Sequence, residues 1–171
     1  SSRRYIERTN VLETIFTTKN GVARVTDAMV TGVAGRLPWA ELARRVDGIE
    51  GSVEFIWRVT PGTMLGTRSP WLDRVGDHTI IRCGELSMAV VGTDHGPATA
   101  DPTSSGPAQL HGRFTASADS RHLIVLTATE GEPLRVPDPR RVDTGIDRTI
   151  ASWLSWSEEF SYDGPWAEQV Q

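Results

Sequence analysis

The chain has 171 residues and a formal net charge of −4, with 38% hydrophobic and 23% charged residues. That length suits one domain with a sizeable core, and the charge balance excludes the basic surface typical of nucleic-acid binding. No apolar stretch approaches the roughly 20 residues of a membrane-spanning helix, and the opening SSRRYIERTN does not form a signal peptide. Cys83 is the single cysteine, which fits a reducing compartment. We therefore expect a cytoplasmic protein with no nucleic-acid or membrane partner.

The clearest predicted element is a β-hairpin over residues 9–29. Two runs rich in Thr, Val, Ile and Phe flank the Asn-Gly pair at 20–21, and this arrangement is the strongest short-range hairpin signal. Leu12 and Phe16 share one face of the first run, and apolar residues also occupy the other face. We therefore expect cover on both faces of the hairpin, inside a layered structure.

Residues 37–60 contain one ambiguous and one clear segment. Pro38 at a first helical position, followed by apolar residues spaced three, one and three, favours a short helix over residues 37–46. Residues 52–60 instead alternate, with Trp57 among the apolar positions and Ile56 as the one exception on the polar face. This alternation predicts a half-buried strand.

The middle of the chain reads as further short strands separated by turns rich in Gly and Pro. Residues 61–71 and 93–107 are predicted loops, and a loop as long as the second is usually functional or mobile. The predicted strands cover 78–83, 87–92 and a second hairpin formed by 109–116 and 122–127. Many short strands with frequent turns indicate an antiparallel β-sandwich.

The apolar period changes to that of a helix near the end of the sequence. Val142, Ile146, Ile150 and Trp153 recur at intervals of four, four and three residues, which marks one face of a helix. Thr144 is the predicted N-cap, with Asp147 near the positive helix start. A break at residues 163–165 is followed by the beginning of another helix, so we expect the chain to be a piece of a longer protein.

Few residues in the sequence suggest chemistry. No Walker or dinucleotide-binding motif is present, and Cys83 at the end of an apolar strand is better interpreted as a buried thiol than as a nucleophile. The histidines lack metal-ligand spacing. Asp94, His95 and Asp101 in one loop could hold a cation, although solvated loop residues are the simpler interpretation. We predict no metal and no cofactor.

Carboxylates and tryptophans raise the question of carbohydrate chemistry. Paired carboxylates would suggest glycoside hydrolysis, but no pairing follows from the positions of Glu13, Glu54, Glu85, Glu158 and Glu159. Trp57 and Trp153 fall on apolar faces and are predicted to pack in the core. Trp71, on a Gly/Pro-rich loop beside Arg68, is the best candidate for a ligand contact, with a structural role equally open.

Three stretches together resemble the N-terminal domain of bacterial glucoamylase-like and trehalase-like proteins of glycoside hydrolase family 15. They are TNVLETIFTTKNGVARVTDAM at 9–29, ELARRVDGIEGSVEF at 41–55 and TIASWLSWSEEFSYDGPWAEQVQ at 149–171. With the GRF at 112–114 the resemblance covers most of the chain, although residues 61–107 match poorly.

The resemblance implies a mainly β, antiparallel supersandwich like that of galactose mutarotase over residues 1–141. A linker helix over residues 142–171 would then lead into an (α/α)6 catalytic domain of the same polypeptide. It also implies that residues 42–46 form a strand, which we accept over the helical interpretation because context overrides weak propensity. In this family the general acid and the general base are glutamates of the (α/α)6 toroid, the catalytic domain, and they act with inversion at the anomeric carbon. No catalytic residue is therefore assigned to this chain.

Two departures from the family pattern stand out. The family usually begins with a segment of the type DGSIDWLCLPRFDSP, which is absent here, and a sandwich without that strand is expected to have an exposed edge. Arg68 matches the arginine of the family's Tyr-Gly-Arg loop, but the tyrosine is missing because this chain reads Leu65-Gly66-Thr67-Arg68.

We therefore expect a non-catalytic domain of an α-glucoside hydrolase that supports the toroid and the rim of its pocket, and that is inactive alone. Arg68 and Trp71 are the predicted substrate contacts, and the predicted interdomain contacts are Trp156, Phe160, Tyr162 and Trp166. Two alternatives stay open: a stand-alone carbohydrate-binding or interaction module, and a mutarotase-like enzyme with a converging His and carboxylate. Homo-oligomer formation is also open.

Overall fold

The computed structural model describes residues 1–31, 39–100, 109–159 and 164. Within these residues every strand pair is antiparallel. The elements are β1 (Ser2–Tyr5), β2 (Leu12–Thr17), β3 (Gly21–Met29), β4 (Trp39–Val59), β5 (Trp71–Val75), β6 (His78–Cys83), β7 (Leu86–Thr93), β8 (Thr99–Ala100), β9 (Leu110–Ser117), β10 (Arg121–Glu130) and α1 (Pro139–Glu158). The predicted mainly β, antiparallel fold with a C-terminal helix is confirmed.

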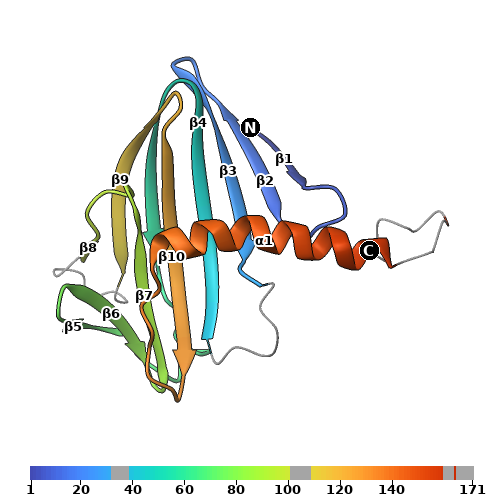
Figure 1. Cartoon of the computed structure of the whole chain (residues 1–171). Coiled ribbons are helices and arrows are strands. Elements are labelled where there is room, and N and C mark those ends of the chain that lie inside the picture. Colours follow the sequence, from blue (N-terminus) through green and yellow to red (C-terminus); the bar gives the residue numbers. More distant parts are fainter. Residues whose placement is uncertain (32–38, 101–108, 160–163, 165–171) are drawn as a thin grey trace.

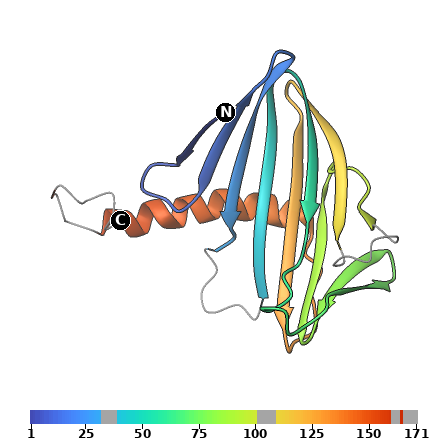
Figure 2. The same cartoon turned by 180° about the vertical axis from the view of Figure 1, so that it is seen from behind.

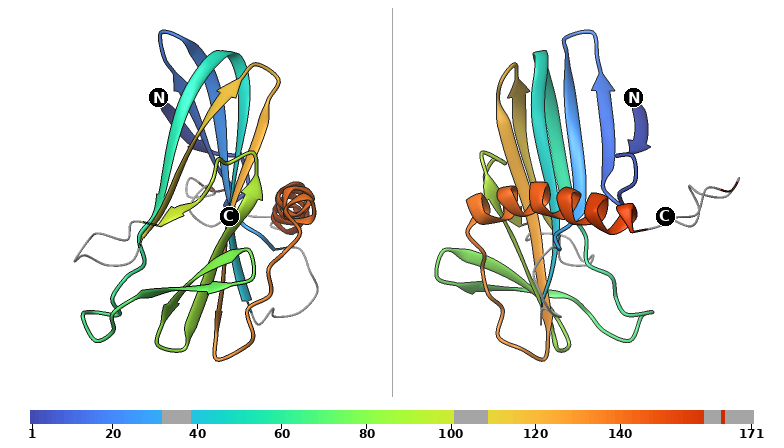
Figure 3. Two further views of the ribbon diagram at one scale, coloured as in Figure 1. Left: turned by 90° about the vertical axis from the view of Figure 1, so that its left-hand side faces the viewer. Right: turned by 45° about the vertical axis from the view of Figure 1, so that its right-hand side comes forward.

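The strands form two layers that share β4. The first layer has the order β1-β2-β3-β4-β10-β7-β6-β5, and the second consists of the latter half of β4 with β9 and β8. Helix α1 lies across the strands on one face of the first layer (Figure 1). The second layer stands on the opposite face, which Figure 2 shows from behind. Seen along the helix, the first layer separates α1 from β9 (Figure 3).

Strand β4 links the layers by bending near Gly48 and Gly51. Its residues up to Asp47 pair with β10, and those from Ser52 pair with β9. Gly51 has a φ of 59°, in the region that favours glycine. A Cβ on Gly48 would lie 1.8 Å from the carbonyl oxygen of Ser117, so the β9–β10 turn packs directly against the bend. Glycine is therefore required where the two layers separate.

This long strand explains one wrong and two correct predictions. The predicted helix over residues 37–46 is wrong from Trp39 onward, because this part of β4 pairs on both sides with β3 and β10; residues 32–38 lie outside the described part of the chain. Ladder pairing on both sides outweighs a weak helical spacing. The strand that the resemblance implied at 42–46 and the alternating strand at 52–60 are confirmed. Trp57 is buried and Ile56 is exposed, as the alternation predicts.

The two predicted hairpins had different outcomes. The hairpin over residues 9–29 is confirmed as β2 and β3, which pair from Leu12↔Asp27 to Thr17↔Val22. The second predicted hairpin is wrong, although both of its strands exist. β9 pairs with the latter half of β4, whereas β10 pairs with the first half of β4 and with β7. A tight turn joins two strands that belong to different layers.

Buried apolar residues form cores on both faces of the first layer. The core under the helix contains Ala43, Val125 and Ile146, each at 0% exposure. Trp57 and Leu110 pack from the second layer onto Ile81 and Ile124, while Val53 and Ala116 pack onto β3 and the first half of β4. The apolar residues on both faces of the first hairpin therefore serve two cores, which confirms the expected layered structure.

Helix α1 begins earlier than its apolar period suggests. Pro139 occupies the first turn, and the Asp138 side chain accepts a hydrogen bond from the Arg140 backbone N–H at 3.0 Å. The predicted cap at Thr144 is wrong, because its hydroxyl lies inside the helix and donates to the Arg140 carbonyl. Pro is well suited to the first helical position, since the missing N–H has no partner there.

An ion-pair network joins α1 to the first layer. The guanidinium of Arg45, on β4, lies 2.9 Å from the Asp147 carboxylate and 3.4 Å from that of Asp143. Arg121 on β10 bridges Asp47 at 2.7 Å and Asp143 at 3.3 Å. Asp147, expected near the helix start for its dipole, thus serves to dock the helix on the sheet. The network fixes where α1 lies across the strands.

Candidate functional site

Three cavities lie along the connecting segment, residues 131–138, which leads from β10 to α1. Val136 lines all three. We call the first the arginine cavity, with a volume of about 460 Å³, and the second the histidine cavity, with about 410 Å³. The third, of about 230 Å³, lies beneath Pro133 and Leu134. Volumes of the first two fall in the range of small-molecule sites.

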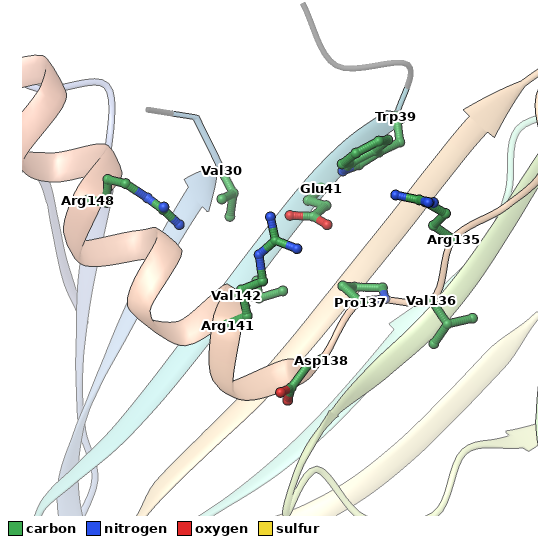
Figure 4. Close-up of a pocket in the computed structure, with 10 residues that line it drawn as sticks. All are labelled: Val30, Trp39, Glu41, Arg135, Val136, Pro137, Asp138, Arg141, Val142 and Arg148. Atoms are coloured by element: carbon green, nitrogen blue, oxygen red, sulfur yellow. The ribbon is translucent and has the colours of Figure 1, made fainter. Parts of the chain in front are cut away.

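The arginine cavity lies between the N-terminal end of β4 and the start of α1 (Figure 4). Trp39 and Glu41 come from β4, Arg135 from the connecting segment, and Arg141 and Arg148 from the helix. Arg141 and Arg148 are seven residues apart, which places both on the side of α1 that faces this space. The remaining lining residues are Val30, Val136, Pro137, Asp138 and Val142.

Glu41 is the one carboxylate that points into the middle of this group (Figure 4). Partial burial raises the pKa of Glu41 above its usual value, and a hydrogen bond from the Trp39 side chain and the charge of Arg141 oppose that shift. Among the described residues, no carboxylate oxygen lies within 4.0 Å of the guanidinium nitrogens of Arg135, Arg141 or Arg148. The cavity is therefore lined by three positively charged arginine side chains and one half-buried glutamate.

The histidine cavity gathers the residue types of proton-transfer chemistry. It is lined by Asp77 and His78 from the β5–β6 turn region and by His95 after β7. The His95 ring packs edge-on against Trp57 with 5.7 Å between centroids, and its backbone carbonyl accepts the Trp57 indole N–H at 2.7 Å. His95 is thus held in place by the inner core, whereas His78 is exposed.

The predicted substrate contacts Arg68 and Trp71 lie away from these cavities. Trp71 opens β5 with 52% of its surface exposed, and the Arg82 guanidinium carbon lies 5.9 Å from its ring centroid. Arg82 is itself held at 3.0 Å by Asp73. Arg68 is exposed, and its side chain runs beside Gly84. The two residues stay predictions as sugar contacts, and one face of the indole already carries a guanidinium.

Of the predicted interdomain residues, Trp156 alone lies in the described part of the chain, near the end of α1. Trp156 is 40% exposed and meets Trp153 edge-on at 5.6 Å between ring centroids. Leu154 is 39% exposed. Phe160, Tyr162 and Trp166 lie outside the described residues. Trp153 itself packs against the core under the helix, as predicted.

The other candidates have mainly structural surroundings. Cys83 is buried, as expected. Of the loop that could hold a cation, Asp101 lies outside the described residues, and the Asp94 carbonyl accepts a hydrogen bond from His122 Nδ1 at 2.7 Å. In the part of the chain that the structure describes, no group of three His, Cys, Asp or Glu residues is placed to hold a metal ion.

The candidate carboxylates are spread over separate elements. Glu13 pairs with Arg4 at 3.0 Å on the outer strands, and Glu54 lies on the exposed side of β4. Glu85 is in the β6–β7 turn, and Glu158 and Glu159 form the exposed end of α1, as predicted. Glu41 was missed by sequence reasoning because residues 37–46 were first interpreted as a helix.

Comparisons with known proteins identify no family. No family model matches the chain, and no curated protein matches it in sequence. Among solved structures, the chain is similar to one titled "Putative kojibiose phosphorylase from human microbiome", with a TM-score of 0.40 and 10% sequence identity. The match covers 91% of this chain and 22% of that one, so this chain spans about a fifth of that protein's length. The resemblance to glycoside hydrolase family 15 stays a prediction.

The structure also bears on the expected relation to membranes. Among the described residues, no helix has both the length and the apolar character needed to cross a bilayer. Helix α1 is amphipathic, with Val142, Gly145, Ile146 and Thr149 buried against the sheet.

Proposed function

We propose that this chain is a non-catalytic β-sandwich domain of a carbohydrate-active enzyme, and that α1 is the helix that joins it to a helical catalytic domain. The single observation that carries the proposal is that the burial of apolar side chains changes along α1. One face of its first three turns is buried on the sheet around Ile146 and is held by Arg45, whereas its last turns leave Leu154 and Trp156 exposed. These last turns extend past the edge of the sheet near β1 (Figure 1).

Exposed apolar side chains at a helix end are expected to be covered by another surface. The anchored first turns of α1 would transmit a fixed orientation to a domain that packs on its last turns. In the finer form of the proposal, the partner is an (α/α)6 toroid of the same polypeptide that cleaves trehalose or short α-glucans. The resemblance at residues 9–29 and 149–171 supports this form.

The test begins with the reading frame after the codon for Gln171. The proposal predicts a helical domain with two glutamates that face one pocket. A stop codon, or a domain of another kind, would contradict it. Calorimetric titration of the purified chain with trehalose and maltose separates the proposal from a stand-alone binding module, because a supporting domain should give no binding heat.

A second candidate is supported by the histidine cavity. A mutarotase-like enzyme needs a histidine and a carboxylate that act together as acid and base, and His78 and Asp77 line the same cavity. Polarimetry of freshly dissolved α-D-glucose decides between the two functions. Faster equilibration with the wild type than with His78→Ala would support the enzyme, and equal rates with and without protein would eliminate it.

A further inference from the structure

The arginine cavity is lined by three exposed arginines, Arg135, Arg141 and Arg148, which the proposed function does not use. Its three guanidinium groups come from the connecting segment and from two turns of α1, and Figure 4 shows those of Arg135 and Arg141 on either side of Glu41. Arg148 points into the same space, with its Nη2 atom close to Gly145. Like charges gathered in this way repel one another unless an anion or solvent separates them.

The acids nearby do not neutralise this group. Asp138 lines the cavity, but its carboxylate accepts the Arg140 backbone N–H at 3.0 Å as the cap of α1, and Figure 4 shows it pointing away from Glu41. Glu41 is half-buried, and this burial raises its pKa against the opposing charge of Arg141. The three arginines thus keep donor capacity that no described carboxylate takes up at ion-pair distance.

Three guanidinium groups around one space suit a tetrahedral oxyanion. A planar carboxylate is satisfied by one Arg fork, whereas a phosphate offers several oxygens to donors from different directions. We propose that the arginine cavity binds a phosphate dianion, either free or carried as a monoester by a small molecule, through Arg135, Arg141 and Arg148. The cavity volume of about 460 Å³ leaves room beside the phosphate for a body of the size of one sugar ring.

Glu41 then limits the affinity of this site. Its carboxylate would repel a phosphate held between the arginines, so the removal of its charge should tighten binding. The Trp39 side chain, which donates to Glu41, forms the apolar wall of the site on β4 (Figure 4). The proposal depends on these residues alone and stands or falls separately from the joining role of α1.

The experiment is a calorimetric titration of the whole chain at low ionic strength and about pH 8, where phosphate is a dianion. Inorganic phosphate and glucose 6-phosphate are the two probes, and glucose is the neutral control. We expect saturable one-site binding of phosphate in the millimolar range or tighter. Equal affinity for both phosphate probes would indicate free phosphate as the ligand, and clearly tighter binding of glucose 6-phosphate would indicate a monoester.

Variants separate the site from general charge effects. Arg141→Gln and Arg148→Gln should each weaken phosphate binding about tenfold, the effect of one lost charge-assisted contact. Arg140→Gln removes the same charge from the neighbouring position of α1, outside the cavity lining, and should leave the affinity unchanged. Glu41→Gln should bind more tightly than the wild type. The absence of saturable binding, or equal weakening by Arg140→Gln and Arg141→Gln in variants with unchanged circular dichroism, would overturn the proposal.

Discussion

Arg45 shows how one side chain can decide where a whole element lies. It is 8% exposed and reaches Asp143 and Asp147 on α1 from the middle of β4. Its Nε has no hydrogen-bond partner among the described atoms, although Asp47 lies 3.8 Å away. A buried cation of this kind is held by charge on several sides, and the loss of one partner leaves the others uncompensated.

Arg45→Met should therefore lower the free energy of unfolding by about 2–3 kcal/mol. Chemical denaturation monitored by circular dichroism measures this change. The adjacent Arg44 is a matched control, since it pairs with Asp27 on the other face of β4 with 53% of its side chain exposed. Arg44→Met should cost less than about 1 kcal/mol. If both variants lost the same stability, the network would not dock the helix.

Glu41 gives the fold a predictable response to pH. Burial raises its pKa in the native state, so the native state prefers the protonated form more than the unfolded chain does. Stability from this group is present at low pH and is lost as the pH rises through the raised pKa. The side chain in Glu41→Gln has no proton to lose, so the melting temperature of this variant relative to the wild type should rise between about pH 4 and pH 7.

The control for this pH effect is Glu54→Gln, whose side chain is exposed on the outer side of β4. Its melting temperature relative to the wild type should change less over the same interval. A larger pH-dependent gain in Glu54→Gln than in Glu41→Gln would show that the half-buried acid is not the source.

At the scale of elements, the bend of β4 is the feature that makes two layers from one strand. A Cβ on Gly48 would meet the Ser117 carbonyl oxygen at 1.8 Å, and this oxygen is a backbone atom that cannot rotate away. Gly48→Ala should lower stability by more than about 2 kcal/mol. Gly62→Ala is the control, since nothing lies within 4 Å of its added Cβ. Equal melting temperatures for the two variants would contradict this account of the bend.

Alanine substitutions in α1 should lower the free energy of unfolding by different amounts along the helix. Ile146 is fully buried, so Ile146→Ala should cost about 3 kcal/mol from lost burial and a cavity. Leu154 is 39% exposed, and Leu154→Ala should cost less than about 1 kcal/mol in this chain. Urea denaturation of both variants measures the difference. A loss in Leu154→Ala as large as that in Ile146→Ala would mean that the last turns of the helix are part of the core.

Local patterns predicted those elements whose turn or side-chain alternation is visible within a short stretch of sequence. The Asn-Gly turn identified β2 and β3, and clean alternation identified the second half of β4. The prediction of a β9–β10 hairpin was wrong because the turn between these strands resembles a hairpin turn. The two strands pair with different halves of β4, which the local sequence does not reveal. The start of α1 was missed because Thr144, inside the apolar period, was predicted as the N-cap in place of Asp138.

The arginine cavity could not be found from sequence because its parts are far apart in the chain. Trp39 and Glu41 lie about a hundred residues before Arg135, Arg141 and Arg148, and they meet because β4 and β10 pair. The seven-residue interval between Arg141 and Arg148 is the one local signal, and it indicates a shared helix face without a partner. Arg68 and Trp71 were chosen for loop composition; Arg68 lies in the loop before β5 and Trp71 at the start of β5, and neither lines this cavity.

For the whole molecule, the two faces of the first layer have different roles. The face toward the second layer is closed by Trp57, Leu110 and the aromatic stack of Phe55 and Phe114. The other face carries α1, whose first turns complete a core and whose last turns leave Trp156 40% exposed. Under the proposed function, such a domain would support a neighbour through the helix, with the catalytic residues in that neighbour.

The most direct measurement of this account compares the hydrolysis of trehalose and maltose by the purified chain and by the polypeptide continued to its natural end. We predict no glucose release by the chain alone, and release with inversion at the anomeric carbon by the longer polypeptide. Glucose release by the 171-residue chain itself, or none by the longer polypeptide, would contradict the proposal that this domain supports a glucoside hydrolase.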